Sequence, residues 1–168
     1  RTVLYAPTWE GENAGNNYTS LDRYGVAIVE ALLGLPGVRV VYRPHPRVAG
    51  TRVIGVATAH ERILRSLAGD PEHVVSTDGS VLALFPSVDA LITDVSSVGL
   101  DFLYRRTGAP LFLTDRRDDR AALALDAPIA AAADVVDSTS IPHLRETLAA
   151  RLADDVRRPE RESVRRLY

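Results

Sequence analysis

Short apolar segments alternate with longer amphipathic segments along most of the chain. A short apolar run bounded by Pro, Gly or Asp is typical of a buried strand. The runs that predict strands cover residues 2–5, 38–42, 73–76, 90–93, 110–113 and 130–136. The last of these consists largely of alanine, which is a weak strand former. We therefore expect six short strands.

The segments between these strands carry helix signals. Ser20 is the expected N-cap of a first helix, which Pro36 and Gly37 end. Thr58 and Glu61 have the spacing of a capping box, so a second helix is predicted from there through residue 67. Further helices are predicted at residues 81–85, at 96–106, and from 139 or 140 to 152.

Strands that alternate with helices form βαβ units, which build a parallel sheet with helices on both faces. We therefore predict an α/β fold with a doubly wound, Rossmann-like parallel sheet. With the usual strand order 3-2-1-4-5-6, the carboxyl ends of the first, second and fourth strands meet where the order reverses. The loops after these strands are 6–9, 43–46 and 94–97. A ligand site is expected where the three loops converge.

Composition narrows the function classes. The chain has 168 residues and a formal net charge of -2, so a nucleic-acid partner has no electrostatic support. It has no cysteine, which excludes disulfides, thiolate chemistry and cysteine-based metal sites and fits a cytoplasmic protein. All 20 basic residues are arginine, so we give arginine counts no functional weight.

One domain accounts for most of the chain. Residues 1–156 are predicted to form the α/β domain, and residues 157–168 an arginine-rich C-terminal helix or tail. We expect the tail to be a solvated helix that packs on a domain outside this chain, with contact to anionic lipid as the alternative. The chain has no Met and begins directly at a strand, from which we expect it to be part of a longer protein.

Two serines, Ser96 and Ser97, stand where the fourth strand ends and the next helix begins. The first turn of a helix has N–H groups without intrahelical partners and a partial positive charge, so hydroxyls beside it can help to hold a phosphate. A serine there can also simply cap the helix. Asp101 follows one turn later and either accepts hydrogen bonds from a ribose or stabilises the helix start.

His45 lies between Pro44 and Pro46 at the end of the second strand. The two prolines restrict the backbone and hold the imidazole in place at little entropic cost. Such a histidine can donate a hydrogen bond to a phosphate or protonate a leaving group. The alternative is a rigid turn with an exposed histidine.

Several common sites are missing from the sequence. No glycine-rich phosphate loop ending in lysine and no Gly-x-Gly-x-x-Gly opens the first helix, so ATPase and NAD-enzyme interpretations lose their main support. Asp118 and Asp119 lie in a charged loop at 115–119 and are expected to be solvated rather than to bind a metal ion.

Three motifs taken together resemble a known family. They are VLYAPTW at residues 3–9, YRPHP at 42–46, and LITDVSS at 91–97 with Asp101 and Phe102 after it. In order and spacing they resemble the carboxyl-terminal half of the CDP-glycerol glycerophosphotransferases, which build teichoic-acid-type polymers. The resemblance spans residues 3–113, with a weaker similarity at 137–152.

This resemblance implies the carboxyl-terminal, nucleotide-binding domain of a GT-B transferase, whose amino-terminal domain supplies the acceptor site and the general base. It implies a CDP-linked donor and a polymer or lipid-linked acceptor as partners, no cofactor or metal ion, and a location in the cytoplasm or at the inner face of the plasma membrane. Carried over residue by residue, His45 is catalytic. The implied substrate-binding residues are Thr8, Arg43, Thr93, Asp94, Ser96, Ser97 and Asp101.

The chain departs from the family pattern at three positions. Glu10 replaces an expected basic residue, Val95 stands where an aromatic residue is common, and Ala109 replaces a lysine. These departures leave the donor open, since they could reshape the pocket for another CDP- or CMP-linked group. A sialyltransferase-like or polysialyltransferase-like enzyme, which also releases CMP, is the main alternative. A non-catalytic nucleotide-binding module is the other.

Overall fold

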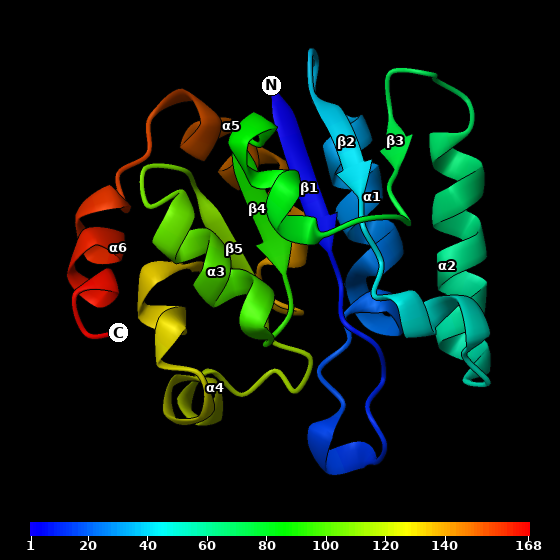
Figure 1. Ribbon diagram of the computed structural model, residues 1–168, viewed down its shortest axis with the longest axis horizontal. Coiled ribbons are helices and arrows are strands. Elements are labelled where there is room, and N and C mark those ends of the chain that lie inside the picture. Colours follow the sequence, from blue (N-terminus) through cyan, green and yellow to red (C-terminus); the bar gives the residue numbers. More distant parts are fainter.

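A six-stranded parallel sheet forms the centre of the molecule (Figure 1). The structure is a computed structural model that describes residues 1–168. The strand order is β3-β2-β1-β4-β5-β6, so the predicted α/β fold and the predicted order are both confirmed. The strands are β1 (Thr2–Ala6), β2 (Arg39–Tyr42), β3 (Val74–Val75), β4 (Ala90–Thr93), β5 (Leu111–Thr114) and β6 (Asp134–Val136).

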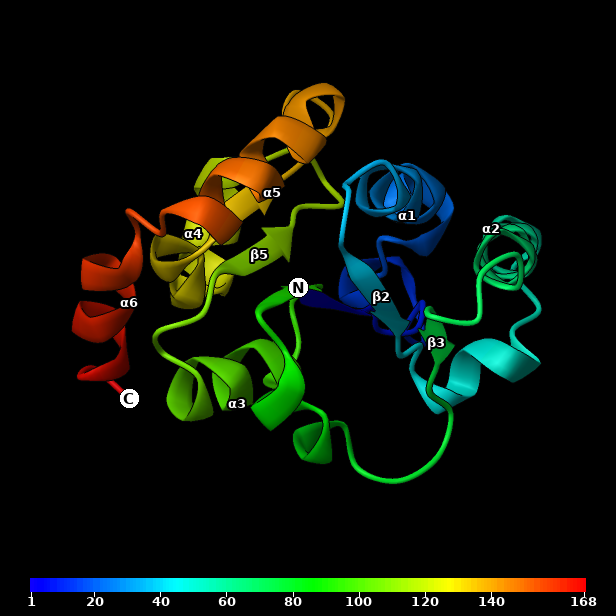
Figure 2. The ribbon, with the colours of Figure 1, turned by 90° about the horizontal axis from the view of Figure 1, so that it is seen from above.

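Helices cover both faces of the sheet. As Figure 2 shows, α1, α2 and α5 lie on one face, and α3 and α6 lie on the other. The α-helices are α1 (Val26–Leu33), α2 (Ile54–Leu67), α3 (Ser97–Arg105), α4 (Arg120–Asp126), α5 (Leu144–Ala153) and α6 (Arg158–Arg165). The shorter helical turns are η1 (Ala14–Asn16), η2 (Leu21–Gly25), η3 (Pro46–Gly50), η4 (Val81–Ala83), η5 (Phe85–Ser87), η6 (Pro128–Ala132) and η7 (Ile141–His143). No helix is long and apolar enough to cross a membrane.

The alternation of side chains along each strand divides the core into two layers. Val3 and Tyr5 of β1 pack in the layer that contains α1 and α5, whereas Leu4 and Ala6 pack in the layer that contains α3. Because both faces of the sheet are covered, both sets of positions must be apolar. The strands are therefore continuous apolar runs in the sequence.

Helix α2 begins one turn earlier than predicted. Its first residue is Ile54, and Thr58 is an exposed residue inside the helix rather than its N-cap. The buried positions of the helix start at Val56 and continue at helical spacing to Leu67, so burial of Val56 extends the helix beyond the capping-box signal. The predicted start at Thr58 is wrong.

The first helix also begins differently from the prediction. The turn η2 is a π-helix, in which the Ser20 carbonyl accepts hydrogen bonds from the N–H groups of Tyr24 and Gly25 at 2.7 and 2.9 Å. The Ser20 side chain does not cap this turn. Its hydroxyl instead forms a 2.6 Å hydrogen bond with the hydroxyl of Tyr5 inside the core. The predicted capping hydrogen bond of Ser20 is therefore replaced by a hydrogen bond to Tyr5 of β1.

Residues 115–136 differ most from the sequence prediction. Asp119 caps α4 by accepting a hydrogen bond from Ala122 N at 2.9 Å, so Asp119 is not merely solvated. The helix has one fully buried residue, Leu123, and for that reason shows no apolar stripe in the sequence. The alanine run before β6 forms the 3-10 turn η6, which leaves a strand of three residues.

Helix α6 packs on this domain. Val164 and the long side chain of Arg161 are buried against the α3 and η6 side of the sheet. Arg161 donates a hydrogen bond from Nε to the carbonyl of Thr107 at 2.9 Å and forms an ion pair with Asp155. The expectation of a solvated tail is therefore wrong for these two residues.

Candidate functional site

A cavity of about 260 Å³ opens at the carboxyl ends of β1, β2 and β4. We call it the switch-point cavity, because it lies where the strand order reverses. The three loops that the sequence singled out come together here. The cavity is lined by Ala6, Pro7, Thr8, Arg43, Pro44, His45, Pro46, Val81, Ser96, Ser97 and Val98.

The structure presents His45 as a neutral hydrogen-bond donor. Its backbone N–H is bonded to the carbonyl of Pro7 at 3.0 Å, which ties the turn to the end of β1. Its Nδ1 accepts a hydrogen bond from Arg47 N at 3.2 Å, so the imidazole proton lies on Nε2. Burial and, secondarily, the positive charge of Arg47 lower the pKa of His45 below its ordinary value of 6.5. At neutral pH the ring therefore donates a hydrogen bond but carries no charge.

Ser96 offers an unused hydroxyl at the start of α3. It is the N-cap residue by position, but its side chain makes no capping hydrogen bond. Its Oγ is buried and has no hydrogen-bond partner at all. Ser97, the first residue of the helix, also lines the cavity. The interpretation that Ser96 merely caps the helix is therefore wrong, and the free hydroxyl and free N–H groups form an arrangement that suits an anion.

Arg43 lines the cavity but its guanidinium is already bonded. It donates to the carbonyl oxygens of Asp78 and Gly79 and more weakly to the hydroxyl of Ser76 at 3.4 Å. These bonds hold the segment between β3 and η4 in place, and this segment carries Val81 to the cavity wall. The structure thus gives Arg43 a positioning role, and its predicted contact with substrate stays a prediction for a residue that lines the cavity.

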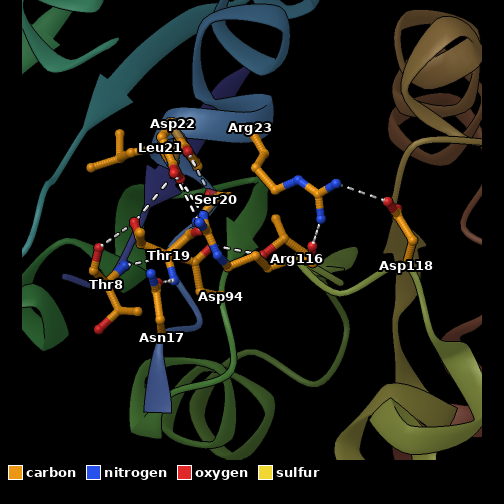
Figure 3. Close-up of polar contacts among 12 residues, drawn as sticks. Thr8, Asn17, Thr19, Ser20, Leu21, Asp22, Arg23, Asp94, Arg116 and Asp118 are labelled. Carbon is orange, nitrogen blue, oxygen red and sulfur yellow. Dashed lines mark hydrogen bonds and ion pairs between the residues drawn. The ribbon is translucent and has the colours of Figure 1, made fainter. Parts of the chain in front are cut away.

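Asp94 and Thr93 lie beneath the cavity rather than in its wall. The Thr93 hydroxyl donates to the carbonyl of Ala6 at 2.8 Å, and both residues are fully buried. Asp94 accepts hydrogen bonds from Thr8 N at 2.7 Å and Ser20 N at 3.2 Å (Figure 3). It also accepts one from the Thr114 hydroxyl at 2.6 Å. The prediction that these two residues touch the substrate is wrong in this structure, because no surface of either is exposed.

Asp94 instead connects three loops at the carboxyl edge of the sheet. Its bonds join the loop after β1, the start of η2 and the end of β5. Burial raises the pKa of Asp94 to about 6, and the hydrogen bonds from Ser20, Thr114 and Thr8 oppose that rise. Asp94 therefore combines a raised pKa with a structural role, since its hydrogen bond positions Thr8 in the cavity wall.

A second polar cluster fastens η2 to the segment after β5. Asp22 pairs with Arg116, and Arg23 pairs with Asp118 at 3.4 Å, as Figure 3 shows. Asp118 has a φ of 55°, a left-handed conformation that is uncommon outside glycine. It also accepts a hydrogen bond from the hydroxyl of Tyr24 at 2.6 Å, which lowers the pKa of its carboxyl. Asp118 is exposed, as expected of a solvated residue, and its carboxylate also takes part in these contacts.

Thr8 and Asp101, the two remaining predicted residues, differ in their position relative to the cavity. Thr8 lines the cavity, its N–H and carbonyl are held by Asp94 and Thr19, and its hydroxyl makes no hydrogen bond within the protein. Asp101 is exposed one turn along α3, makes no hydrogen bond and lies outside the cavity wall. The predicted ribose contact of Asp101 thus stays a prediction, because Asp101 is not among the residues that line the cavity.

Sequence reasoning missed the apolar walls of the cavity. Val81 and Val98 line it together with the two prolines beside His45. Val98 comes from the first turn of α3, and Val81 comes from a turn that follows the segment bonded to Arg43. The structure has no group of three or more His, Asp or Glu side chains placed to hold a metal ion.

Comparisons with known structures confirm the fold. An α,α-trehalose 6-phosphate synthase from Burkholderia multivorans has a TM-score of 0.65 at 13% identity, over 99% of this chain and 39% of that one. The N-terminal domain of a trehalose-6-phosphate phosphatase from Candida albicans has a TM-score of 0.62 at 14% identity, over 99% and 38%. This chain thus spans about two fifths of the length of these structures.

The alignment with a single-domain structure covers a larger share of the matched structure. The C-terminal CMP-Kdo binding domain of WaaA from Acinetobacter baumannii has a TM-score of 0.57 at 13% identity, over 98% of this chain and 88% of that domain. No curated protein sequence matches the chain.

A family comparison provides the identity that these distant structures leave open. Residues 1–113 match the sequence model of the CDP-glycerol:poly(glycerophosphate) glycerophosphotransferases. The matched part contains the whole switch-point cavity, from Ala6 to Val98. The chain therefore belongs to the CDP-glycerol:poly(glycerophosphate) glycerophosphotransferase family.

Proposed function

We propose that this chain is the donor-binding half of a glycerophosphotransferase. The enzyme transfers glycerol phosphate from CDP-glycerol to a hydroxyl of a polymer or lipid-linked acceptor and releases CMP. The observation that carries the proposal is the cavity itself: an unbonded Ser96 hydroxyl, a helix N-terminus and a neutral His45 N–H converge at the switch point of a family member. The acceptor site and the general base belong to a part of the protein outside this chain.

The proposed reaction is an in-line displacement at phosphorus. The acceptor oxygen attacks the phosphorus that carries glycerol, the bond from that phosphorus to the bridging oxygen breaks, and the electron pair leaves with CMP. The proton of the acceptor hydroxyl passes to the general base. The protein must align the reactants and stabilise the charge that grows on the leaving phosphate.

Three groups of this chain can stabilise that charge. The Nε2–H of His45 donates a hydrogen bond, and the Ser96 and Ser97 hydroxyls donate beside the N–H groups of α3. A neutral imidazole gives up its proton reluctantly, so His45 acts as a hydrogen-bond donor rather than as a proton source for the leaving group. We include no metal ion or other cofactor in this proposal.

The first test is ligand selectivity of this chain. We expect CMP and CDP-glycerol to raise the melting temperature, whereas ATP and NAD leave it unchanged, because binding to the folded state alone stabilises it. Equal shifts with all four ligands would remove the cytidine assignment. Titration of the His45→Ala variant then tests the site, since the variant should lose affinity for the diphosphate donor and keep its affinity for cytidine.

A glycosyltransferase that uses a CMP-linked sugar is the second candidate. The likeness to a CMP-Kdo binding domain, which extends over 88% of that domain, favours it. Both reactions release CMP and differ in whether phosphorus or an anomeric carbon is attacked. The full-length protein should be assayed with labelled CDP-glycerol and with a labelled CMP-sugar. Turnover of the CMP-sugar alone would replace the first candidate by the second.

A further inference from the structure

The switch-point cavity has one charged side chain in its wall, and the hydrogen bonds of that side chain go to the protein itself. Arg43 and His45 are the only cationic or titratable side chains in its wall. The guanidinium of Arg43 is bonded to the carbonyls of Asp78 and Gly79, and the lowered pKa of His45 leaves its ring neutral. Arg43 keeps its charge, because its partners are neutral, but a nucleoside diphosphate carries more than one negative charge, so one cation in the wall leaves part of the charge of the proposed ligand unmatched.

Arg47 is a second cation, and it directly follows the wall residue Pro46. Its backbone N–H is bonded to Nδ1 of His45. Its guanidinium lies over the ring of Trp9, with Cζ 4.2 Å from the ring centre, and the Trp9 and His45 rings are 6.2 Å apart between centres. The side chain of Arg47 makes no hydrogen bond and no ion pair. Its charge is also close enough to His45 to contribute to the lowered pKa of that residue.

No acidic side chain near Trp9 pairs with the guanidinium of Arg47. Glu10 follows Trp9 directly, but its carboxylate accepts a hydrogen bond from the hydroxyl of Thr51 and does not pair with Arg47. Glu10 also occupies the position where the family resemblance leads one to expect a basic residue. The chain therefore lacks a cation on the β1 side of the cavity and has an unpaired one on the β2 side.

We propose that Arg47 is the phosphate-binding cation of this site, held ready on Trp9 and moved onto the diphosphate by rotation of its side chain. This inference rests on the proposed function and adds to it the residue that selects a diphosphate over a monophosphate. An exposed cation–π contact is weak, whereas a guanidinium bonded to a phosphate makes strong, charge-assisted hydrogen bonds. The exchange of partners therefore favours the bound phosphate.

The expected signature is a graded loss of affinity. A hydrogen bond to a charged group is strong enough that its removal lowers affinity about tenfold or more. The Arg47→Gln variant keeps a planar group on Trp9 but removes the charge, so it should bind CDP at least about tenfold more weakly than the wild type. The loss should be smaller for CMP and absent for cytidine, which has no phosphate.

Arg52 provides the matched control. It is an exposed arginine on the segment before α2 and contacts neither Trp9 nor His45. The Arg52→Gln variant removes the same charge five residues further along the chain. If the effect of Arg47 is specific, Arg52→Gln should bind CDP within about twofold of the wild type, apart from a small salt-dependent change.

The experiment is isothermal titration of wild type, Arg47→Gln and Arg52→Gln with CDP, CMP and cytidine at low and moderate salt. NMR titration of the His45 ring gives a second readout, because loss of the Arg47 charge should raise the His45 pKa. Wild-type CDP affinity in Arg47→Gln, an equal loss for all three ligands, or an equal loss in Arg52→Gln would each overturn the inference and leave the proposed function standing. Failure of the wild type to bind any cytidine ligand would overturn both.

Discussion

Replacement of Asp94 by asparagine should stabilise this protein at neutral pH. Asp94 is fully buried and accepts three hydrogen bonds. An asparagine can keep all three contacts, because its oxygen can accept from the N–H groups of Thr8 and Ser20 while its amide group donates to the Thr114 hydroxyl. The substitution therefore removes a buried charge without leaving a buried polar group unpaired.

The magnitude follows from the pKa of the carboxyl. Burial raises the pKa of Asp94 from 3.8 to about 6, and this rise corresponds to about 3 kcal/mol of free energy by which folding disfavours the ionised form. Asp94→Asn should therefore increase the free energy of unfolding by up to about 3 kcal/mol above pH ~7. Asp94→Ala should decrease it by at least about 2 kcal/mol, since two N–H groups and a hydroxyl lose their acceptor.

The sign of the pH dependence is determined by the raised pKa. A carboxyl whose pKa is higher in the folded state contributes stability below its unfolded pKa, 3.8, and that contribution is lost as the pH rises through about 6. The advantage of Asp94→Asn over the wild type should therefore be largest above pH ~7. It should shrink as the pH falls and vanish below about 3.8.

Urea unfolding followed by circular dichroism, for the wild type and both variants at several pH values, measures these differences directly. Other carboxyls also change the stability with pH. The pKa of Asp118, for example, is lowered in the folded state, so its contribution to stability is lost in acid. Because these carboxyls are the same in the wild type and in Asp94→Asn, the difference between the two proteins reports Asp94 alone. An Asp94→Asn variant as unstable as Asp94→Ala at neutral pH would show that the negative charge itself is required, and would refute the reasoning.

Three further predictions concern single side chains. Ser96→Ala should leave the free energy of unfolding within about 0.5 kcal/mol of the wild type, because the Ser96 Oγ has no partner. The same variant should bind CMP about fivefold more weakly in a titration. Unchanged CMP affinity would remove Ser96 from the site. Arg161→Ala should destabilise the protein by about 3 kcal/mol or more in urea, because Asp155 loses its buried partner, and a loss below about 1 kcal/mol would contradict this. Val56→Ala should lower the free energy of unfolding in urea by about 2 kcal/mol, because Val56 is buried, whereas Thr58→Ala should change it little. A larger loss for Thr58→Ala than for Val56→Ala would restore Thr58 as the N-cap.

The sequence predicted the sheet because its signal is local and redundant. Each strand is an apolar run bounded by breakers, and parallel strands buried on both faces need little else. The strand order followed from a general rule for βαβ units rather than from particular residues. The same rule brought the loops at His45 and Ser96 to one place, and the cavity there agrees with it.

The errors concern residues whose role depends on a distant partner. Ser20 has the sequence features of an N-cap, yet its hydroxyl is bonded to Tyr5. Asp94 has the position of a ligand-binding residue, yet its acceptors are used by Thr8 and two other segments. Arg43 was assigned to the substrate, yet it holds the loop that carries Val81. In each case the folded structure supplies a partner within the protein that the sequence does not reveal.

The sequence by itself thus determined the α/β sheet, its strand order and the place where its polar loops converge. Each strand is a local apolar run, and the order in which strands and helices alternate along the chain favours one sheet topology. Only the tertiary structure decided which polar groups at that place are free. Arg43 and Asp94 are bonded within the protein, whereas the Ser96 hydroxyl and the Arg47 guanidinium are not. The physical reason is that hydrogen bonds between distant segments form only after the sheet has brought their strand ends together.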